Sequence, residues 1–136
     1  MKRLLGGLMC LMMLFVTPVW AEGEEEGAPV EDYVGYVELK PFIVNFGGPG
    51  KTRFLKCEIS ISVGSEATQF AVNQHMAQIR NDLVFLLSAQ SEENVSSVKA
   101  QTELAQSGLK LVQNILVEEV GEAMVNDLFF TSFVVQ

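Results

Sequence analysis

The sequence predicts an α+β domain in which two helices pack on a small antiparallel or mixed sheet. Two stretches of alternating apolar and polar residues flank Gly47-Gly48-Pro49-Gly50 and indicate a β-hairpin at the start of the domain. Between residues 65 and 120 the apolar spacing changes to about 3.6 residues, which is typical of helices. Residues 126–136 are rich in aromatic and β-branched side chains and predict a closing strand.

The first 21 residues have the pattern of a targeting segment. Lys2 and Arg3 precede an apolar run of residues 4–16, and the small Ala21 closes the segment. This pattern favours a secretory signal peptide cleaved after Ala21. The alternative is an uncleaved signal anchor, because residues 4–21 would reach about 27 Å as a helix, close to the hydrocarbon thickness of a bilayer. Under both interpretations the basic flank stays in the cytoplasm and the domain lies outside it.

Residues 22–32 are rich in glutamate and predict an acidic, flexible linker before a domain of residues 33–136. A metal site is the alternative for this cluster, but nothing holds its carboxylates in a fixed geometry. The formal charge of the chain is −8, and without Lys2 and Arg3 it would be −10, from 7 basic and 17 acidic residues. Such an acidic domain repels phosphate backbones, so we expect no nucleic-acid partner.

The predicted hairpin has one interrupted and one regular strand. Residues 33–46 alternate, but Pro41 lacks a backbone N–H and places this strand at a sheet edge or breaks it. Arg53–Val63 alternates strictly, with its odd residues on the core face. The predicted contact surface combines the exposed faces of the helices with the opposite face of this strand, which carries Lys56, Glu58, Ser60 and Ser62. The glycine-rich segment is interpreted as a turn, since a phosphate-binding loop would need a Lys-Ser/Thr ending and a helix start.

The helical region divides into two predicted helices. The first begins after an N-cap at Ser65 and runs to about residue 88. Its expected core face consists of Phe70, Met76, Ile79, Leu83, Leu86 and Leu87. The second begins after Ser96 or Ser97 and ends at a Gly121 C-cap, while Gly108 inside it predicts a bend or a close contact. Its candidate core positions are Val98, Leu104, Leu111, Val112, Ile115 and Leu116.

Residues able to carry chemistry are few. His75 is the only histidine, and without a nearby cysteine, second histidine or carboxylate it is expected neither to bind a metal nor to act in catalysis. Cys57 falls on the apolar face of its strand and is expected to be a buried small apolar residue. Arg80 and Asp82 are expected to form surface ion pairs worth about 0–1 kcal/mol. We therefore predict no catalytic, cofactor-binding or metal site.

The closing stretch of residues 126–136 carries large apolar side chains on both alternating faces. Strict alternation groups Leu128, Phe130 and Val134 on one face and Phe129, Phe133 and Val135 on the other. A strand with two apolar faces is usually central in a sheet or covered on both sides. Because terminal residues fray unless they are tied down, we expect that removal of residues 131–136 unfolds the domain.

Four segments follow one another in an order typical of a known family. They are YVELKPFIVN at 36–45, RFLKCEISI at 53–61, IRNDLVFLLS at 79–88 and FTSFVVQ at 130–136. With these segments the chain resembles the flagellar basal body-associated protein FliL family. The resemblance implies a stomatin/prohibitin-like periplasmic domain that forms rings around flagellar stator units. It also implies support of motor torque and of swimming or swarming motility, without catalysis or cofactors.

The resemblance further implies a single-pass inner-membrane protein, whereas a cleaved leader would leave a soluble periplasmic relative. A generic periplasmic scaffold or binding module with the same fold and no flagellar role is the alternative. A small periplasmic enzyme is a third hypothesis. It would need a pocket that unites His75 with a carboxylate and a hydroxyl, and the sequence does not provide that spacing.

Overall fold

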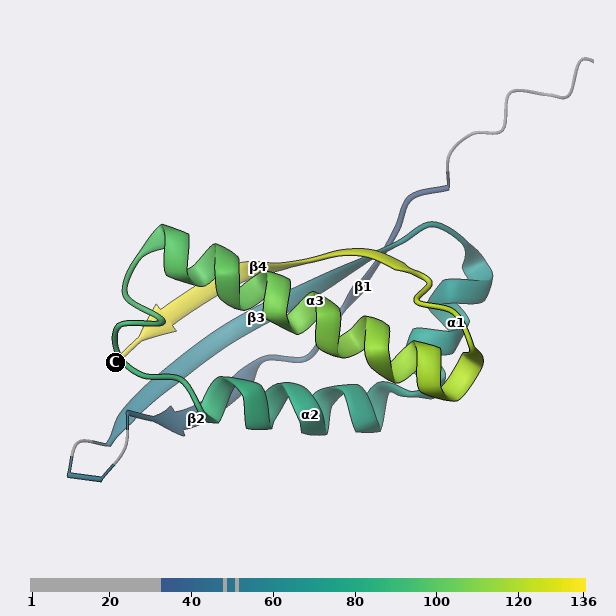
Figure 1. The fold of residues 1–136 in the computed structure, drawn as a ribbon. Helices are drawn as coiled ribbons and strands as arrows, with labels where there is room; N and C mark the ends of the chain where they lie inside the picture. The colour runs from purple at the N-terminus through teal and green to yellow at the C-terminus, as the bar shows by residue number, and fades with distance from the viewer. Residues whose placement is uncertain (1–32, 48, 51) are drawn as a thin grey trace, which may run out of the picture.

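The computed structural model describes residues 33–136 except Gly48 and Lys51. In chain order the elements are β1 (Gly35–Glu38), β2 (Phe42–Phe46), β3 (Arg53–Val63), α1 (Glu66–Gln74), α2 (Met76–Ser88), α3 (Val98–Val120) and β4 (Val125–Val135). Helices α2 and α3 lie side by side across one face of an antiparallel sheet (Figure 1). The α+β prediction is therefore confirmed, while the predicted leader and linker lie outside the described residues.

β3 is the central strand and pairs along both of its edges. β1 and β2 share one edge, because the segment around Pro41 interrupts what would otherwise be one strand. β4 occupies the other edge. The predicted hairpin is confirmed, and its turn contains Gly47 and Gly50 with φ of 100° and 98°, a conformation that glycine adopts without strain.

β4 is an edge strand, so the expectation of a central position is wrong. Its pairing with β3 is also irregular. Ser132 lies opposite Glu58, whereas Phe130 lies opposite Ile59, the next β3 residue. Thr131 is therefore an extra residue in β4, as in a β-bulge.

The bulge corrects the predicted faces of β4. An extra residue shifts the alternation by one position, so side chains beyond it exchange faces. Five apolar residues lie opposite the inward-facing residues of β3 and share the helix-covered face: Val125, Leu128, Phe130, Phe133 and Val135. Phe129 and Val134 lie on the opposite face.

The described residues form three helices instead of the two predicted. His75, with φ of −100° and ψ of 15°, interrupts the first predicted helix between α1 and α2. Ser65 caps α1 as expected, since its hydroxyl oxygen accepts a hydrogen bond from the Thr68 N–H at 3.1 Å. The interruption breaks the helical phase, and Phe70 is 68% exposed although it was predicted in the core.

α3 matches the prediction at both ends. The Ser97 hydroxyl oxygen caps its start, and Gly121 ends it in the left-handed conformation. Val98 was predicted in the core but is 81% exposed, because it lies in the first turn, beyond the packed part of the helix. Gly108 makes the predicted close contact: a Cβ atom at this position would lie 3.3 Å from a methyl carbon of Leu128.

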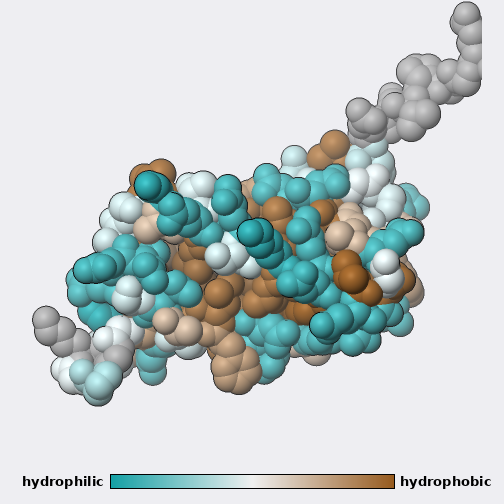
Figure 2. All heavy atoms as spheres, in the orientation of Figure 1, coloured by the Kyte–Doolittle hydropathy of each residue, from teal (hydrophilic) through white to brown (hydrophobic). Residues whose placement is uncertain are grey.

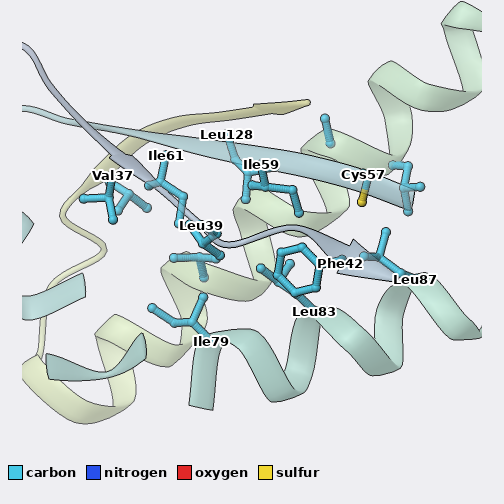
Figure 3. Packing of buried hydrophobic residues seen from close by; sticks show 14 of the residues in the cluster. Val37, Leu39, Phe42, Cys57, Ile59, Ile61, Ile79, Leu83, Leu87 and Leu128 are labelled. Atoms are coloured by element: carbon cyan, nitrogen blue, oxygen red, sulfur yellow. The ribbon is translucent and has the colours of Figure 1, made fainter. Parts of the chain in front are cut away.

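The core lies between the sheet and the helices. Figure 3 shows Phe42 of β2 pointing toward Leu83 and Leu87 of α2, with Ile79 one turn earlier beside Leu39. The inward residues of β3 are almost fully buried: Leu55, Cys57, Ile59, Ile61 and Val63. Each large aliphatic side chain buried in this way stabilises the fold by about 1.5–3 kcal/mol.

Candidate interaction surface

His75 lies at the junction between α1 and α2. It ends α1, where its N–H donates to the Ala71 carbonyl at 3.1 Å, and it directly precedes α2. Within the described residues, no three histidine, cysteine or acidic side chains lie close enough to hold a metal ion. His75 therefore marks the junction of two helices.

Cys57 is buried on the inner face of β3. Burial raises the pKa of its thiol from the ordinary value of 9.0 to about 12, because the apolar core disfavours the thiolate. A thiol that stays protonated is a poor nucleophile. The prediction of a buried apolar role for Cys57 is confirmed.

Arg80 does not form the surface ion pair expected of it. Its guanidinium donates to the backbone carbonyl of Lys40 at 2.6 Å and to that of Pro41 at 3.3 Å. The same group lies 4.2 Å from the centroid of the Phe42 ring. Arg80 thus joins α2 to the break between β1 and β2, where backbone carbonyls lack strand partners. Asp82 accepts a hydrogen bond from the Asn81 side chain at 3.3 Å.

We define the outer sheet face as the face of the sheet turned away from the helices. It carries the even residues 54–62 of β3 together with alternate residues of the flanking strands. Of the predicted contact residues, Lys56 and Glu58 are exposed and Ser62 is half-buried. Ser60 is only 3% exposed, so its place in the predicted contact surface is wrong.

The burial of Ser60 follows from two aromatic side chains on the neighbouring strands. Tyr36 lies beside Ser62, and Phe129 lies beside Ser60 on the other edge of β3. Their rings meet edge to face across β3, with centroids 6.0 Å apart. Only small side chains fit beneath them. Aromatic pairs of this geometry contribute about 0.5–1.5 kcal/mol beyond the area they bury.

The outer sheet face is more apolar than β3 alone indicates. Ile43 and Val134 lie on either side of Lys56, and Phe54 is the next outward residue of β3. All three apolar side chains are exposed. The sequence contained this signal, since these residues occupy alternate positions, but only the pairing of three strands brings them together. Contiguous apolar patches on a soluble domain often mark sites of protein contact.

A second surface, with one charged residue in its lining, lies between α3 and β4. A groove there is lined by Val98, Thr102 and Ala105 of the helix and by Phe129 and Phe130 of the strand. On the helix-bearing side, hydrophobic surface also shows between α2 and α3, bordered by hydrophilic side chains (Figure 2). A shallow depression at that helix pair includes Leu111 and Ile115 but also charged residues. The groove beside β4 is therefore the less charged of the two.

No helix in the described part of the chain combines the length and the hydropathy needed to cross a bilayer.

The fold and its surfaces define a small α+β domain whose sheet is covered by helices on one face and exposed on the other. This class of domain is suited to contacts with other proteins. The family model for the flagellar basal body-associated protein FliL matches residues 36–136. The chain belongs to this family, as its sequence motifs predict. It is also similar to the flagellar protein FliL of Aquifex aeolicus (strain VF5), with 27% identity over 109 residues. That match covers 80% of this chain and 65% of the length of the relative.

Proposed function

We propose that this protein is a non-enzymatic structural component of the flagellar basal body that supports the stator units of the motor. The observation that carries the proposal is the family match, which spans every described helix and strand apart from the first residue of β1. The relative in Aquifex aeolicus is named as a flagellar protein, which agrees with this role. In this role the protein would sustain torque during swimming and swarming.

Self-association into a ring around the stator and a stomatin/prohibitin-like fold are parts of the same proposal. Its physical support is the amount of surface available for contacts. The outer sheet face presents exposed apolar residues, and one edge of β4 has no strand partner among the described residues. A ring requires two contact surfaces on each subunit, one for each of its neighbours.

The proposed location is the periplasmic side of the inner membrane. Residues 1–21 would act as a signal anchor or as a cleaved signal peptide, and residues 22–32 as an acidic linker to the domain. The two forms of the leader have different consequences, because cleavage releases the domain into the periplasm. A membrane-fraction immunoblot with and without a signal peptidase inhibitor distinguishes them: a larger, membrane-bound product appearing only with the inhibitor indicates cleavage.

Deletion of the gene in its own host tests the proposed role. We expect smaller swimming and swarming zones, with flagella still present, because the motor would lose stator support. The matched control is the deletion strain carrying the intact gene, which should recover both zones. A deletion strain that swims and swarms normally would overturn the proposal and favour a periplasmic scaffold without a flagellar role.

A further inference from the structure

β4 presents a long strand edge without the residues that usually block one. One of its edges pairs with β3, and no other described strand pairs with it. Free backbone N–H and C=O groups on a strand edge are a template for another strand, and proteins block them with Pro, Lys, a short strand or a bulge, of which β4 has only the bulge. β4 has 11 residues with no Pro, Lys or Arg. The opposite edge of the sheet, in contrast, is split between two short strands and carries Lys40 and Pro41 at the split.

The backbone direction of β4 follows from its pairing. Phe54 and Gln136 exchange both backbone hydrogen bonds, at 2.8 and 2.9 Å. In an antiparallel ladder such pairs alternate with pairs whose N–H and C=O groups point away from each other. The β4 residues opposite the odd residues of β3 therefore direct these groups toward the free edge. From the register shift at Asn126 to the last paired residue of β4 they are Leu128, Phe130, Phe133 and Val135, which also share the helix-covered face; Val125, opposite Val63, lies beyond that shift.

The bulge at Thr131 makes this set symmetric along the strand. The spacing between its four members is two, three and two residues, so it is the same in both directions. An antiparallel second β4 then matches the first at each of these four positions, with Leu128 opposite Val135 of the second copy and Phe130 opposite Phe133 of the second copy. A strand with a strict period of two would match a second copy in several registers, whereas the extra residue leaves one register that matches both halves of β4. We propose that β4 pairs antiparallel with β4 of a second copy of this chain, so that two sheets join into one.

The outer sheet face agrees with the same register. It places Phe129 opposite Val134 of the second copy, so both outward apolar side chains of β4 gain apolar neighbours. Pairs of large apolar residues opposite each other are a main source of stability between strands. The proposed pairing thus matches side chains on both faces and backbone groups along the edge.

The charge distribution leaves this edge open to a second copy although the chain is acidic overall. The chain carries a formal charge of −8, so two copies repel each other in most orientations. The groove beside the free edge contains only one charged residue, Asp127. The α3 residues that line it are uncharged: Val98, Gln101, Thr102, Ala105 and Gln106. Two acidic molecules approach each other at least cost along such a strip.

This pairing deepens the proposed self-association and rests on it for its cellular setting. A two-fold contact closes with two copies and cannot propagate by itself. A ring would therefore consist of such pairs joined through another surface, for which the exposed apolar part of the outer sheet face is available.

Register-specific disulfides test the pairing in the full-length chain carrying Cys10→Ser. Residues 129 and 134 lie about 16 Å apart along one strand, too far for an internal disulfide. In the proposed dimer they face each other as a pair without hydrogen bonds, about 4.5 Å apart between Cα atoms. We expect Phe129→Cys/Val134→Cys to form a covalent dimer on mild oxidation, while each single variant stays monomeric on a non-reducing gel. Equal cross-linking of the single variants, or none of the double variant, overturns the register.

A variant at the symmetry centre supplies a second readout. Thr131→Lys brings two lysines together in the dimer, so we expect light scattering to show a monomer with an unchanged circular dichroism spectrum. Ser107→Lys, exposed on α3, is the matched control and should keep the dimer. A Thr131→Lys dimer as stable as that of the control would contradict the pairing; if the variant unfolds, the disulfide experiment decides.

The two proposals fail in different ways. If the double cysteine variant does not cross-link while the intact gene restores motility to the deletion strain, the pairing is wrong and the flagellar role stands. If it cross-links while the deletion strain swims normally, the pairing stands and the flagellar role is wrong.

Discussion

The guanidinium of Arg80 stacks on the ring of Phe42, 4.2 Å from its centroid, and at the same time donates to two backbone carbonyls. Those carbonyls belong to Lys40 and Pro41, at the break between β1 and β2. One side chain of α2 therefore holds together the point where the edge of the sheet loses its regular pairing. Pro41, Phe42 and Arg80 also lie in the segments that carry the family resemblance, and this contact gives their combination a structural reason.

Replacement of Arg80 by lysine should destabilise the domain. A lysine keeps the charge, but it has no planar group that can stack on Phe42 while it bridges two carbonyls. The lost hydrogen bond and stacking predict a decrease of about 1–2 kcal/mol in the free energy of unfolding, measured in urea. Lys110→Ala, at an exposed cation on α3, should change it by less than about 0.5 kcal/mol. Equal stabilities of the two variants would show that the Arg80 contact contributes little.

Cys57 should make stability fall at high pH. Its pKa is raised by burial from 9.0 to about 12, so the unfolded chain loses this proton at a lower pH than the folded chain does. The contribution of the protonated thiol to the free energy of unfolding is complete below pH 9. It declines as the pH rises from 9.0 to about 12, with a slope of up to about 1.4 kcal/mol per pH unit. Denaturation of Cys10→Ser and of Cys10→Ser/Cys57→Ala between pH 8 and about pH 11 measures this decline. The second variant has no thiol at position 57, so its free energy of unfolding should lack the part of the pH dependence that is due to Cys57.

The same thiol should be inert while the domain is folded. In Cys10→Ser we expect a thiol reagent at pH 8 to react with Cys57 only in denaturant, because the reactive thiolate is disfavoured and the sulfur is shielded. Reaction of the folded protein at the rate of a free cysteine would show that β3 opens readily.

Gly108 should tolerate no β-branched side chain. Added atoms would meet two methyl carbons of Leu128 at 3.3 and 3.5 Å and one of Leu83 at 3.6 Å from the Cβ position. Overpacking of this kind costs about 1–3 kcal/mol, more than valine gains over glycine in helix propensity. Thermal unfolding of Gly108→Val measures the cost, with Ser107→Val as the control at the adjacent exposed position. A melting temperature unchanged from the wild type would mean that α3 and β4 are not in close contact.

Removal of residues 131–136 should abolish cooperative unfolding. It deletes Phe133 and Val135 from the core side of the sheet and leaves one edge of β3 without a partner along residues 54–58. Deletion of Gln136 alone removes the two backbone hydrogen bonds with Phe54 and should lower stability only slightly. A longer truncation that melts at the same temperature as the full chain would show that these residues are not part of the core.

Local patterns were sufficient for much of this fold. Alternation identified β3 and its buried face, Pro41 predicted the interrupted strand, and Ser65, Ser97 and Gly121 marked helix ends. Each of these features depends on a short stretch of backbone and its immediate hydrogen bonds. The candidate interaction surface was harder to predict from the sequence, because the side chains of the outer sheet face come from strands far apart in the sequence. Phe129 and Tyr36 meet there only through their shared partner β3.

The amino-acid sequence alone determined the fold class, the burial of Cys57 and the family, because these follow from periodicity, composition and motif order. Only the tertiary structure decided that β4 lies at the sheet edge, that Thr131 is a bulge and that His75 divides a helix. These features depend on how elements fit against one another: an extra residue in β4 is defined by its partner strand, and a helix break depends on which surface each half must cover. Packing between distant segments therefore decides which faces of this domain remain free for a partner.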